Sequence, residues 1–193
     1  MISFLDLKGI NAREREALIA AFTRVLDSGW YVLGKEVEAF EQEFAAASGA
    51  PYAVGVANGT DAIALLLRAG GVGAGDEVIV PAQTHVATAH AVELTGAKPV
   101  FVDIDPLDFN IAVDQIEAAI TPLTKALLPV SLFGQMPDYD AINAIAAKHG
   151  ITVIEDAAQS FGATRRGRKS CGVTTIASTS FYPAKPLGCY GEG

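Results

Sequence analysis

The stretch KALLPVSLFGQMPDYDAINAIAAKHGITVIED, residues 125–156, contains the pattern that decides the fold. It opens with the apolar run Lys125–Val130, which is typical of a buried strand. A helical pattern follows over Tyr139–Lys148 and ends at Gly150, and a second apolar run covers Ile151–Glu155. A strand, a helix and a strand in this order predict a βαβ unit with two parallel strands.

The same alternation continues outward on both sides of this unit. Because the runs are nearly all apolar, the strands are expected to be buried on both faces, in an α/β fold with a mostly parallel sheet flanked by helices. The further predicted strands are Tyr52–Ala57, Glu77–Val80, Pro99–Asp103 and Ile176–Phe181. The further predicted helices are Glu14–Leu26, Lys35–Ala47, Ala62–Arg68, Thr84–Leu94 and Val113–Ile120.

Composition excludes several classes of protein. Of the 193 residues, 50% are hydrophobic and 19% are charged, which suits a globular protein with a large core. The net charge of -8 argues against nucleic-acid binding. Two cysteines imply no disulfide framework, and neither a signal peptide nor a membrane span is expected. These features predict a cytoplasmic protein with no membrane partner.

Ligands of parallel sheets bind beyond the carboxyl ends of the strands, so the residues there are candidates for a site. Asn58-Gly59-Thr60-Asp61 lies directly before a helix, where free amides and the Thr60 hydroxyl would bind an anion. An ordinary helix cap explains the same residues. His85 could lie flat on a planar ligand or bond to backbone at a helix start. His90 and His149 lack the spacing of a metal site.

Two further side chains follow strands. Asp156 would be the magnesium-side carboxylate of a nucleotide hydrolase only if a phosphate-binding loop were present, and the sequence has none. It therefore needs another cation, such as a protonated ring nitrogen. Lys185 lies between prolines, in a turn close after a strand, where a lysine could act as a nucleophile. By base rate it would be a surface lysine.

A dinucleotide site is the competing use of this architecture. Gly71-Val-Gly73-Ala-Gly75 lacks the final glycine spacing and precedes a strand instead of opening a helix, so it does not match the fingerprint. A nucleotide-binding α/β domain with an incidental lysine stays an open alternative.

Taken together, these segments resemble the sugar aminotransferases of the DegT/DnrJ/EryC/StrS family, which have the fold of aspartate aminotransferase. The motifs that carry the resemblance are Gly29-Trp-Tyr-Val-Leu-Gly34, Ala57-Asn-Gly-Thr-Asp-Ala62, Gly73-Ala-Gly-Asp-Glu-Val78, Val100-Phe-Val-Asp-Ile-Asp105, Val130-Ser-Leu-Phe-Gly134, Ile154-Glu-Asp-Ala-Ala-Gln-Ser160 and Ser180-Phe-Tyr-Pro-Ala-Lys185. The resemblance implies an N-terminal helical segment over residues 1–50. It also implies a large domain of the type I fold, which binds pyridoxal 5'-phosphate (PLP), over residues 51–193.

The resemblance also implies roles for residues at the matching positions. Gly59 and Thr60 would bind the cofactor phosphate together with Ser180, and His85 would stack on the pyridine ring. No metal is implied.

Three further side chains would act on the ring and on the substrate. By the same resemblance Asp156 would pair with the pyridine nitrogen and Gln159 would bond the ring hydroxyl. Lys185 would be the catalytic residue that forms the Schiff base with PLP and moves protons at the substrate carbon.

Finer resemblance points to enzymes that aminate carbon 3 of UDP-2-acetamido-2-deoxy-3-oxo-glucuronic acid with L-glutamate, for surface polysaccharide (O-antigen) synthesis. Relatives that act on 4-keto or dTDP sugars share most of the motifs. The family is homodimeric with a composite active site, and it continues past the lysine into a small C-terminal domain that this sequence lacks. The chain is therefore expected to be a fragment of a longer enzyme or a truncated, non-catalytic PLP-binding module.

Overall fold

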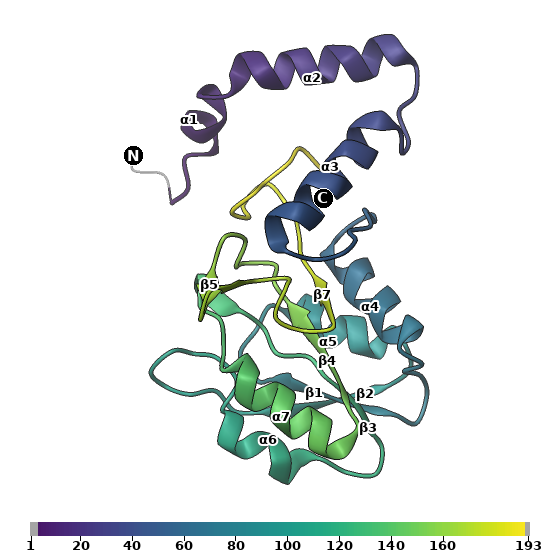
Figure 1. Ribbon diagram of the computed structural model, residues 1–193, viewed down its shortest axis with the longest axis vertical. Coiled ribbons are helices and arrows are strands. Elements are labelled where there is room, and N and C mark those ends of the chain that lie inside the picture. Colours follow the sequence, from purple (N-terminus) through teal and green to yellow (C-terminus); the bar gives the residue numbers. More distant parts are fainter. Residues whose placement is uncertain (1–3, 192–193) are drawn as a thin grey trace. The chain divides into compact units, whose positions relative to one another are not determined.

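The computed structural model describes residues 4–191 of the chain (Figure 1). These residues fall into two compact units, divided between Gly55 and Val56, and each unit is described by itself. Residues 1–3 and 192–193 belong to the two segments expected from the sequence and lie outside the described residues.

The first unit is helical. It contains α1 (Leu7–Ala12), α2 (Arg15–Ser28) and α3 (Lys35–Ser48), of which α2 and α3 were predicted and α1 was not. Gly29 and Gly49 end α2 and α3 in the left-handed conformation, which glycine adopts without a steric cost. An ion pair of 2.9 Å between Arg24 Nε and Glu36 Oε1 joins α2 to α3.

The second unit is built on a sheet of five parallel strands. These are β1 (Glu77–Pro81), β2 (Lys98–Val102), β3 (Thr124–Leu127), β4 (Thr152–Asp156) and β7 (Ile176–Ser178). They lie in the order β2-β1-β3-β4-β7, so the chain crosses over the sheet between neighbours. The predicted α/β class with a mostly parallel sheet is confirmed.

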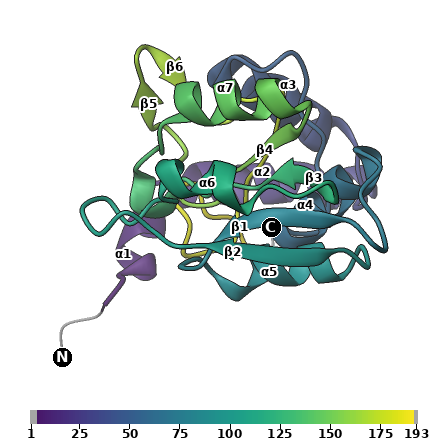
Figure 2. The same ribbon diagram turned by 90° about the horizontal axis from the view of Figure 1, so that it is seen from below.

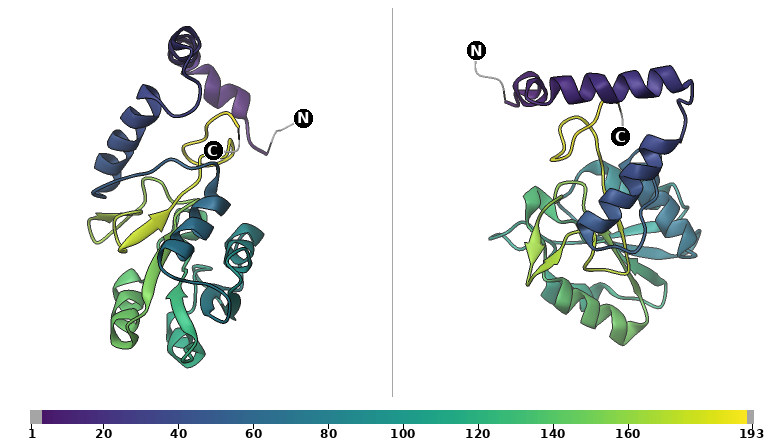
Figure 3. Two further views of the ribbon diagram at one scale, coloured as in Figure 1. Left: turned by 90° about the vertical axis from the view of Figure 1, so that its right-hand side faces the viewer. Right: turned by 45° about the horizontal axis from the view of Figure 1, so that its top comes forward.

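Helices cover both faces of this sheet (Figures 2 and 3). Val78 and Val80 of β1 pack in one apolar cluster with α4 (Gly59–Ala69) and α5 (Val86–Glu93). Ile79, between them, points to the other face and packs with α6 (Val113–Ala119) and α7 (Tyr139–His149). None of the helices in the described part of the chain is long and apolar enough to cross a membrane.

One predicted strand is wrong. Residues 52–57 form no strand, and Tyr52 and Val54 are 86% and 79% exposed. An apolar run becomes a strand only where a neighbouring strand takes its N–H and C=O groups, and no described segment pairs with this run. The strand predicted over Ile176–Phe181 is shorter than expected, because the chain leaves the sheet after Ser178.

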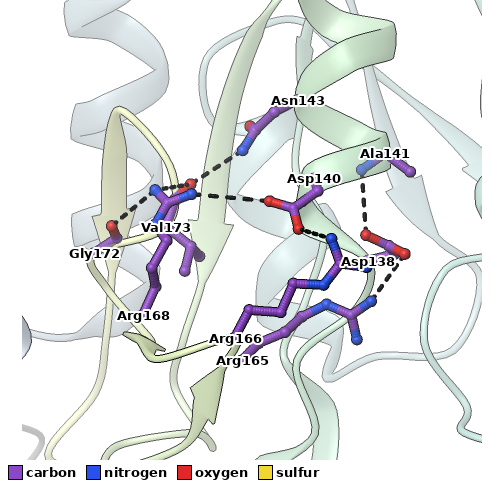
Figure 4. Close-up of polar contacts among 9 residues, drawn as sticks. All are labelled: Asp138, Asp140, Ala141, Asn143, Arg165, Arg166, Arg168, Gly172 and Val173. Atoms are coloured by element: carbon purple, nitrogen blue, oxygen red, sulfur yellow. Dashed lines mark hydrogen bonds and ion pairs between the residues drawn. The ribbon is translucent and has the colours of Figure 1, made fainter.

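A small hairpin that was not predicted packs against α7. It consists of β5 (Thr164–Arg165) and β6 (Arg168–Lys169). Its arginines pair with two aspartates at the start of α7 (Figure 4): Arg165 Nη2 lies 2.8 Å from Asp138 Oδ2, and Arg166 Nη1 lies 2.7 Å from Asp140 Oδ2. Asp138 also caps α7, because its Oδ1 accepts a hydrogen bond of 3.2 Å from Ala141 N.

The two aspartates are expected to differ in their contribution to stability. Asp138→Ala removes both the cap and the partner of Arg165, whose buried Nε lacks a hydrogen-bond partner within residues 4–191. We expect it to lower the free energy of unfolding by about 1–2 kcal/mol. Asp140→Ala, the matched control, removes only exposed ion pairs and should cost about 0.5 kcal/mol or less. Urea unfolding of both variants measures the difference, and equal losses would contradict it.

Candidate active site

A single cavity of about 1020 Å³ in the second unit is lined by every residue that the sequence put forward for the site. These residues come from the start of α4, the loop after β1, the end of β4 and the segment after β7. The cavity therefore lies beyond the carboxyl ends of the strands, where ligands of parallel sheets bind. The seven residues are Gly59, Thr60, His85, Asp156, Gln159, Ser180 and Lys185.

The start of α4 forms one end of the cavity. Asn58 caps the helix, since its Oδ1 accepts a hydrogen bond of 2.9 Å from Asp61 N. The two preceding amides, at Gly59 and Thr60, have no acceptor within the helix and carry the positive end of its dipole. A Cβ on Gly59 would lie 3.1 Å from Ser180 Cβ, so the glycine keeps this corner open. Cap and anion site are thus compatible uses of the same residues.

Asp156 lies at another wall of the cavity and is only 5% exposed. Its Oδ2 accepts a hydrogen bond of 2.8 Å from Thr88 Oγ1, and its Oδ1 accepts one of 3.1 Å from Ala158 N. Burial raises the pKa of Asp156 above its usual value. The two hydrogen bonds and the nearby charge of Lys185 lower the pKa and offset only part of that rise. A cation bound in the cavity would compensate this desolvated carboxylate.

His85 is a helix cap that also lines the cavity. It is the N-cap of α5, and its Nδ1 accepts a hydrogen bond of 3.2 Å from Ala87 N, which places the ring proton on Nε2. The same ring lines the cavity. His90 is exposed at the cavity margin, and His149 pairs with Glu117 at 2.9 Å, away from it.

Lys185 lies in a turn that brings it to the cavity. Its backbone N–H donates to Tyr182 O at 2.8 Å, and Pro186 ends the possibility of a regular helix there. The side chain is half-buried and lines the cavity together with Tyr182 and Pro186. It is therefore not the freely solvated surface lysine that base rates favour.

Gln159 has its amide orientation set by a neighbour. Its Oε1 accepts a hydrogen bond of 2.8 Å from Phe133 N, so Nε2 is the end left to donate to a ligand. Phe133 lines the same cavity and adopts a left-handed conformation with a φ of 55°, which is strained for a residue with a side chain.

Neither Phe133 nor Thr88 was predicted as a site residue. For Thr88 the sequence carries no signal, because its role depends on the hydrogen bond of 2.8 Å that its hydroxyl donates to Asp156 Oδ2. For Phe133 no sequence signal reports its backbone conformation.

Comparison with known proteins now assigns the family. Residues 12–193 match the sequence profile of the DegT/DnrJ/EryC1/StrS aminotransferase family. The chain belongs to this family. A curated relative from Pseudomonas aeruginosa, UDP-2-acetamido-2-deoxy-3-oxo-D-glucuronate aminotransferase, is 58% identical over 193 residues, which are 100% of this chain and 54% of the relative. A dTDP-3-amino-3,4,6-trideoxy-alpha-D-glucose transaminase from Streptomyces venezuelae is 49% identical over 194 residues, 100% of this chain and 51% of the relative.

Solved structures agree with this assignment. DesV from S. venezuelae, in complex with a ketimine intermediate, superimposes with a TM-score of 0.96 at 49% identity, covering 98% of this chain and 51% of DesV. NtdA from Bacillus subtilis, with the bound cofactor PMP, has a TM-score of 0.91 at 39% identity, covering 98% of this chain and 43% of NtdA. The chain thus spans about half the length of the relatives that it matches.

The two thiols of the chain are expected to react at different rates. Burial and the nearby Glu155 raise the pKa of the Cys171 thiol to about 12. Burial also raises the pKa of the Cys189 thiol, but this residue is exposed. Because the thiolate is the reactive form, Ellman's reagent at pH 8 should modify Cys189 at least about 10-fold faster. Peptide mapping identifies the modified thiol, with Cys189→Ser as the control. Faster labelling of Cys171 than of Cys189 would contradict the burial of the Cys171 thiol.

Proposed function

We propose that this chain is the cofactor-binding part of a PLP-dependent aminotransferase that acts on a keto nucleotide sugar, with Lys185 as its catalytic lysine. The observation that carries the proposal is the single cavity that joins the α4 amides, the buried Asp156 and Lys185. An anion site, an uncompensated carboxylate and an amine are the three groups that a phosphorylated pyridine aldehyde requires. Family membership supports the same cofactor.

The donors at the start of α4 suit the cofactor phosphate. The amides of Gly59 and Thr60 and the hydroxyls of Thr60 and Ser180 are hydrogen-bond donors, and the helix dipole favours a negative ligand there. This half of the site holds the phosphate without a lysine or arginine among the predicted ligands, so it depends on geometry and on the open corner at Gly59.

Three other lining residues suit the ring. Asp156 would hold a proton on the ring nitrogen by an opposite-charge pair, Gln159 would donate Nε2 to the ring hydroxyl, and His85 would cover one face. When bound, PLP supplies the electron sink for the substrate carbon. Lys185 Nζ would hold the cofactor and would take and return the proton at that carbon. Binding of the ring, control of its protonation and proton transfer at the substrate carbon are therefore assigned to different side chains.

For the substrate, we favour carbon 3 of UDP-2-acetamido-2-deoxy-3-oxo-glucuronic acid, with L-glutamate as amino donor, in surface polysaccharide synthesis. The 58% identity to the P. aeruginosa aminotransferase supports this choice. The S. venezuelae transaminase supports a dTDP sugar as the alternative, and a 4-keto nucleotide sugar is the other. A homodimer with a composite site belongs to the same proposal. A screen of UDP- and dTDP-keto sugars with the full-length polypeptide decides between these substrates.

Lys185 is expected to be the residue that PLP labels. Borohydride treatment after PLP addition fixes the cofactor to the amine that reacts with it, and peptide mapping should place the label on Lys185. Lys185→Ala should lose the label and at least about 10²-fold of the transamination rate, because proton transfer by a positioned side chain contributes about 10²–10⁴-fold. Lys125→Arg, on β3, is the control and should keep both.

Labelling at another lysine would sink the assignment. If Lys185 is labelled but glutamate yields no pyridoxamine phosphate, the polypeptide is a binding module and not an enzyme.

Gln159→Glu is expected to weaken PLP binding. The carboxylate keeps an acceptor for Phe133 N but has no N–H to donate to the ring oxygen in its ionised form. Loss of one hydrogen bond to a charged group predicts a rise of about 10-fold in the dissociation constant. Gln115→Glu, an exposed change of the same kind on α6, is the control. Fluorescence titration with PLP measures both, and an unchanged constant for Gln159→Glu would exclude Gln159 as a ring ligand.

A further inference from the structure

A second buried carboxylate lies next to Asp156 and has no part in the proposed chemistry. Glu155 precedes Asp156 on β4 and is 0% exposed. Successive residues of a strand point to opposite faces, and the partners show this: Asp156 bonds Thr88 on α5, whereas Glu155 bonds Ser131, which in turn meets Tyr139 on α7.

Every recorded partner of the Glu155 carboxylate is neutral. Its Oε1 accepts hydrogen bonds of 2.8 Å from Ser131 Oγ and 2.7 Å from Ser170 Oγ, and its Oε2 accepts one of 2.8 Å from Cys171 N. No ion pair found within residues 4–191 involves it. Burying a carboxylate without a cation costs free energy. A fold that keeps such a carboxylate is therefore expected to need its hydrogen bonds to hold neighbouring segments in place.

The hydrogen bonds extend beyond Glu155 in two directions. Ser131 Oγ lies 2.9 Å from Tyr139 Oη, and Ser170 Oγ lies 2.7 Å from Ser160 Oγ. Each hydroxyl has one proton, so if Ser131 and Ser170 donate to Glu155, Tyr139 and Ser160 must donate to them. Glu155 is then the final acceptor of both branches, and Ser160 gives its proton to Ser170 at 2.7 Å in place of the longer contact with Ala157 O at 3.4 Å.

The branch through Ser160 reaches the cavity. Ser160 closes the turn of residues 157–160, which directly follows Asp156 on β4, because its N–H donates to Ala157 O at 3.1 Å. Gln159 lies in this turn, and Asp156 and Gln159 both line the cavity. Asp156, before the turn, is fixed by sheet pairing to Ser178, and Ser160, the last residue of the turn, is fixed by the hydroxyl of Ser170. The hydrogen bonds from Ser160 to Ser170 and from Ser170 to Glu155 therefore tie the end of this turn to Glu155.

From this geometry we infer that Glu155 is a positioning residue: through Ser170 and Ser160 it fixes the turn that follows Asp156, within residues 156–160, and so the place of Gln159 beside Asp156 in the cavity. Its effect on PLP rests on the proposed function, whereas its effect on the turn does not. Glu155 touches no ligand itself, because it points to the opposite face of β4.

Glu155→Gln tests this with little change of shape. Its amide group must face either Cys171 N–H, as a second donor, or the two serine hydroxyls, which then have to turn. In the cofactor-free full-length polypeptide, we expect amide hydrogen exchange of residues 156–160 to rise by about 10-fold, the scale of one lost hydrogen bond to a charged group. PLP should bind about 10-fold more weakly, with a shifted absorption maximum of the bound cofactor.

The control is Glu77→Gln, a change of the same kind at the other end of the sheet. Glu77 is also nearly buried and accepts hydrogen bonds from Thr121 and Lys98, far along the strands from the cavity. It should lower stability without changing exchange of residues 156–160 or the absorption maximum. If both glutamate variants change the cavity equally, Glu155 stabilises the fold in general and the inference fails.

A serine pair keeps the test decisive if Glu155→Gln does not fold. Ser170→Ala and Ser131→Ala each remove one donor to the same Oε1, but only Ser170 is linked to Ser160. We expect Ser170→Ala to raise exchange of residues 156–160 at least about 5-fold and Ser131→Ala to change it less than about 2-fold. Equal effects overturn the inference. If the variants change amide exchange as expected but the wild type binds no PLP, the proposed function fails and the role of Glu155 in the turn stands.

Discussion

The pairing of β4 with strands on both sides is the constraint on which the rest of the second unit depends. β4 lies between β3 and β7 in the sheet, and Asp156 N and O bond to the chain on the β3 side at Pro129 and Ser131. This holds two acidic residues out of water on opposite faces of one strand. Desolvated carboxylates are costly, and the cost is offset only by fixed donors. The donors of Asp156 face the cavity helix α5, and those of Glu155 face α7 and the hairpin.

Much of this fold could be predicted, because parallel strands buried on both faces have an unmistakable apolar pattern. The β1 residues Val78, Ile79 and Val80 show why: alternate residues enter different clusters, yet all three are apolar. The failures have a common cause. Residues 52–57 are as apolar as a strand but lack a pairing partner, and the β5–β6 hairpin is too short and too polar to show a pattern. Pairing is a long-range property that no local window contains.

In the candidate site, too, some residues could be predicted from the sequence and others could not. Asp156 and Lys185 could be put forward as candidates because they lie at or after the ends of strands, and strand ends meet at one edge of the sheet. For Lys185 position alone favoured a surface lysine, and only the family resemblance implied its role. Thr88, Phe133 and Glu155 could not be put forward, because their contributions depend on which atom faces which partner. Phe133 acts through a backbone N–H, and nothing in the sequence distinguishes Glu155 from any other polar residue next to Asp156.

The cavity also has a built-in polarity. The helix start at one wall carries partial positive charge, and the carboxylate at the other carries negative charge. A molecule with an anion at one end and a cation at the other is aligned by this field before any short contact forms, and a molecule entering backwards meets like charge at both ends. Under the proposed function the pocket would thus select the orientation of its ligand as well as its identity, on a chain whose net charge of -8 would by itself repel an anion.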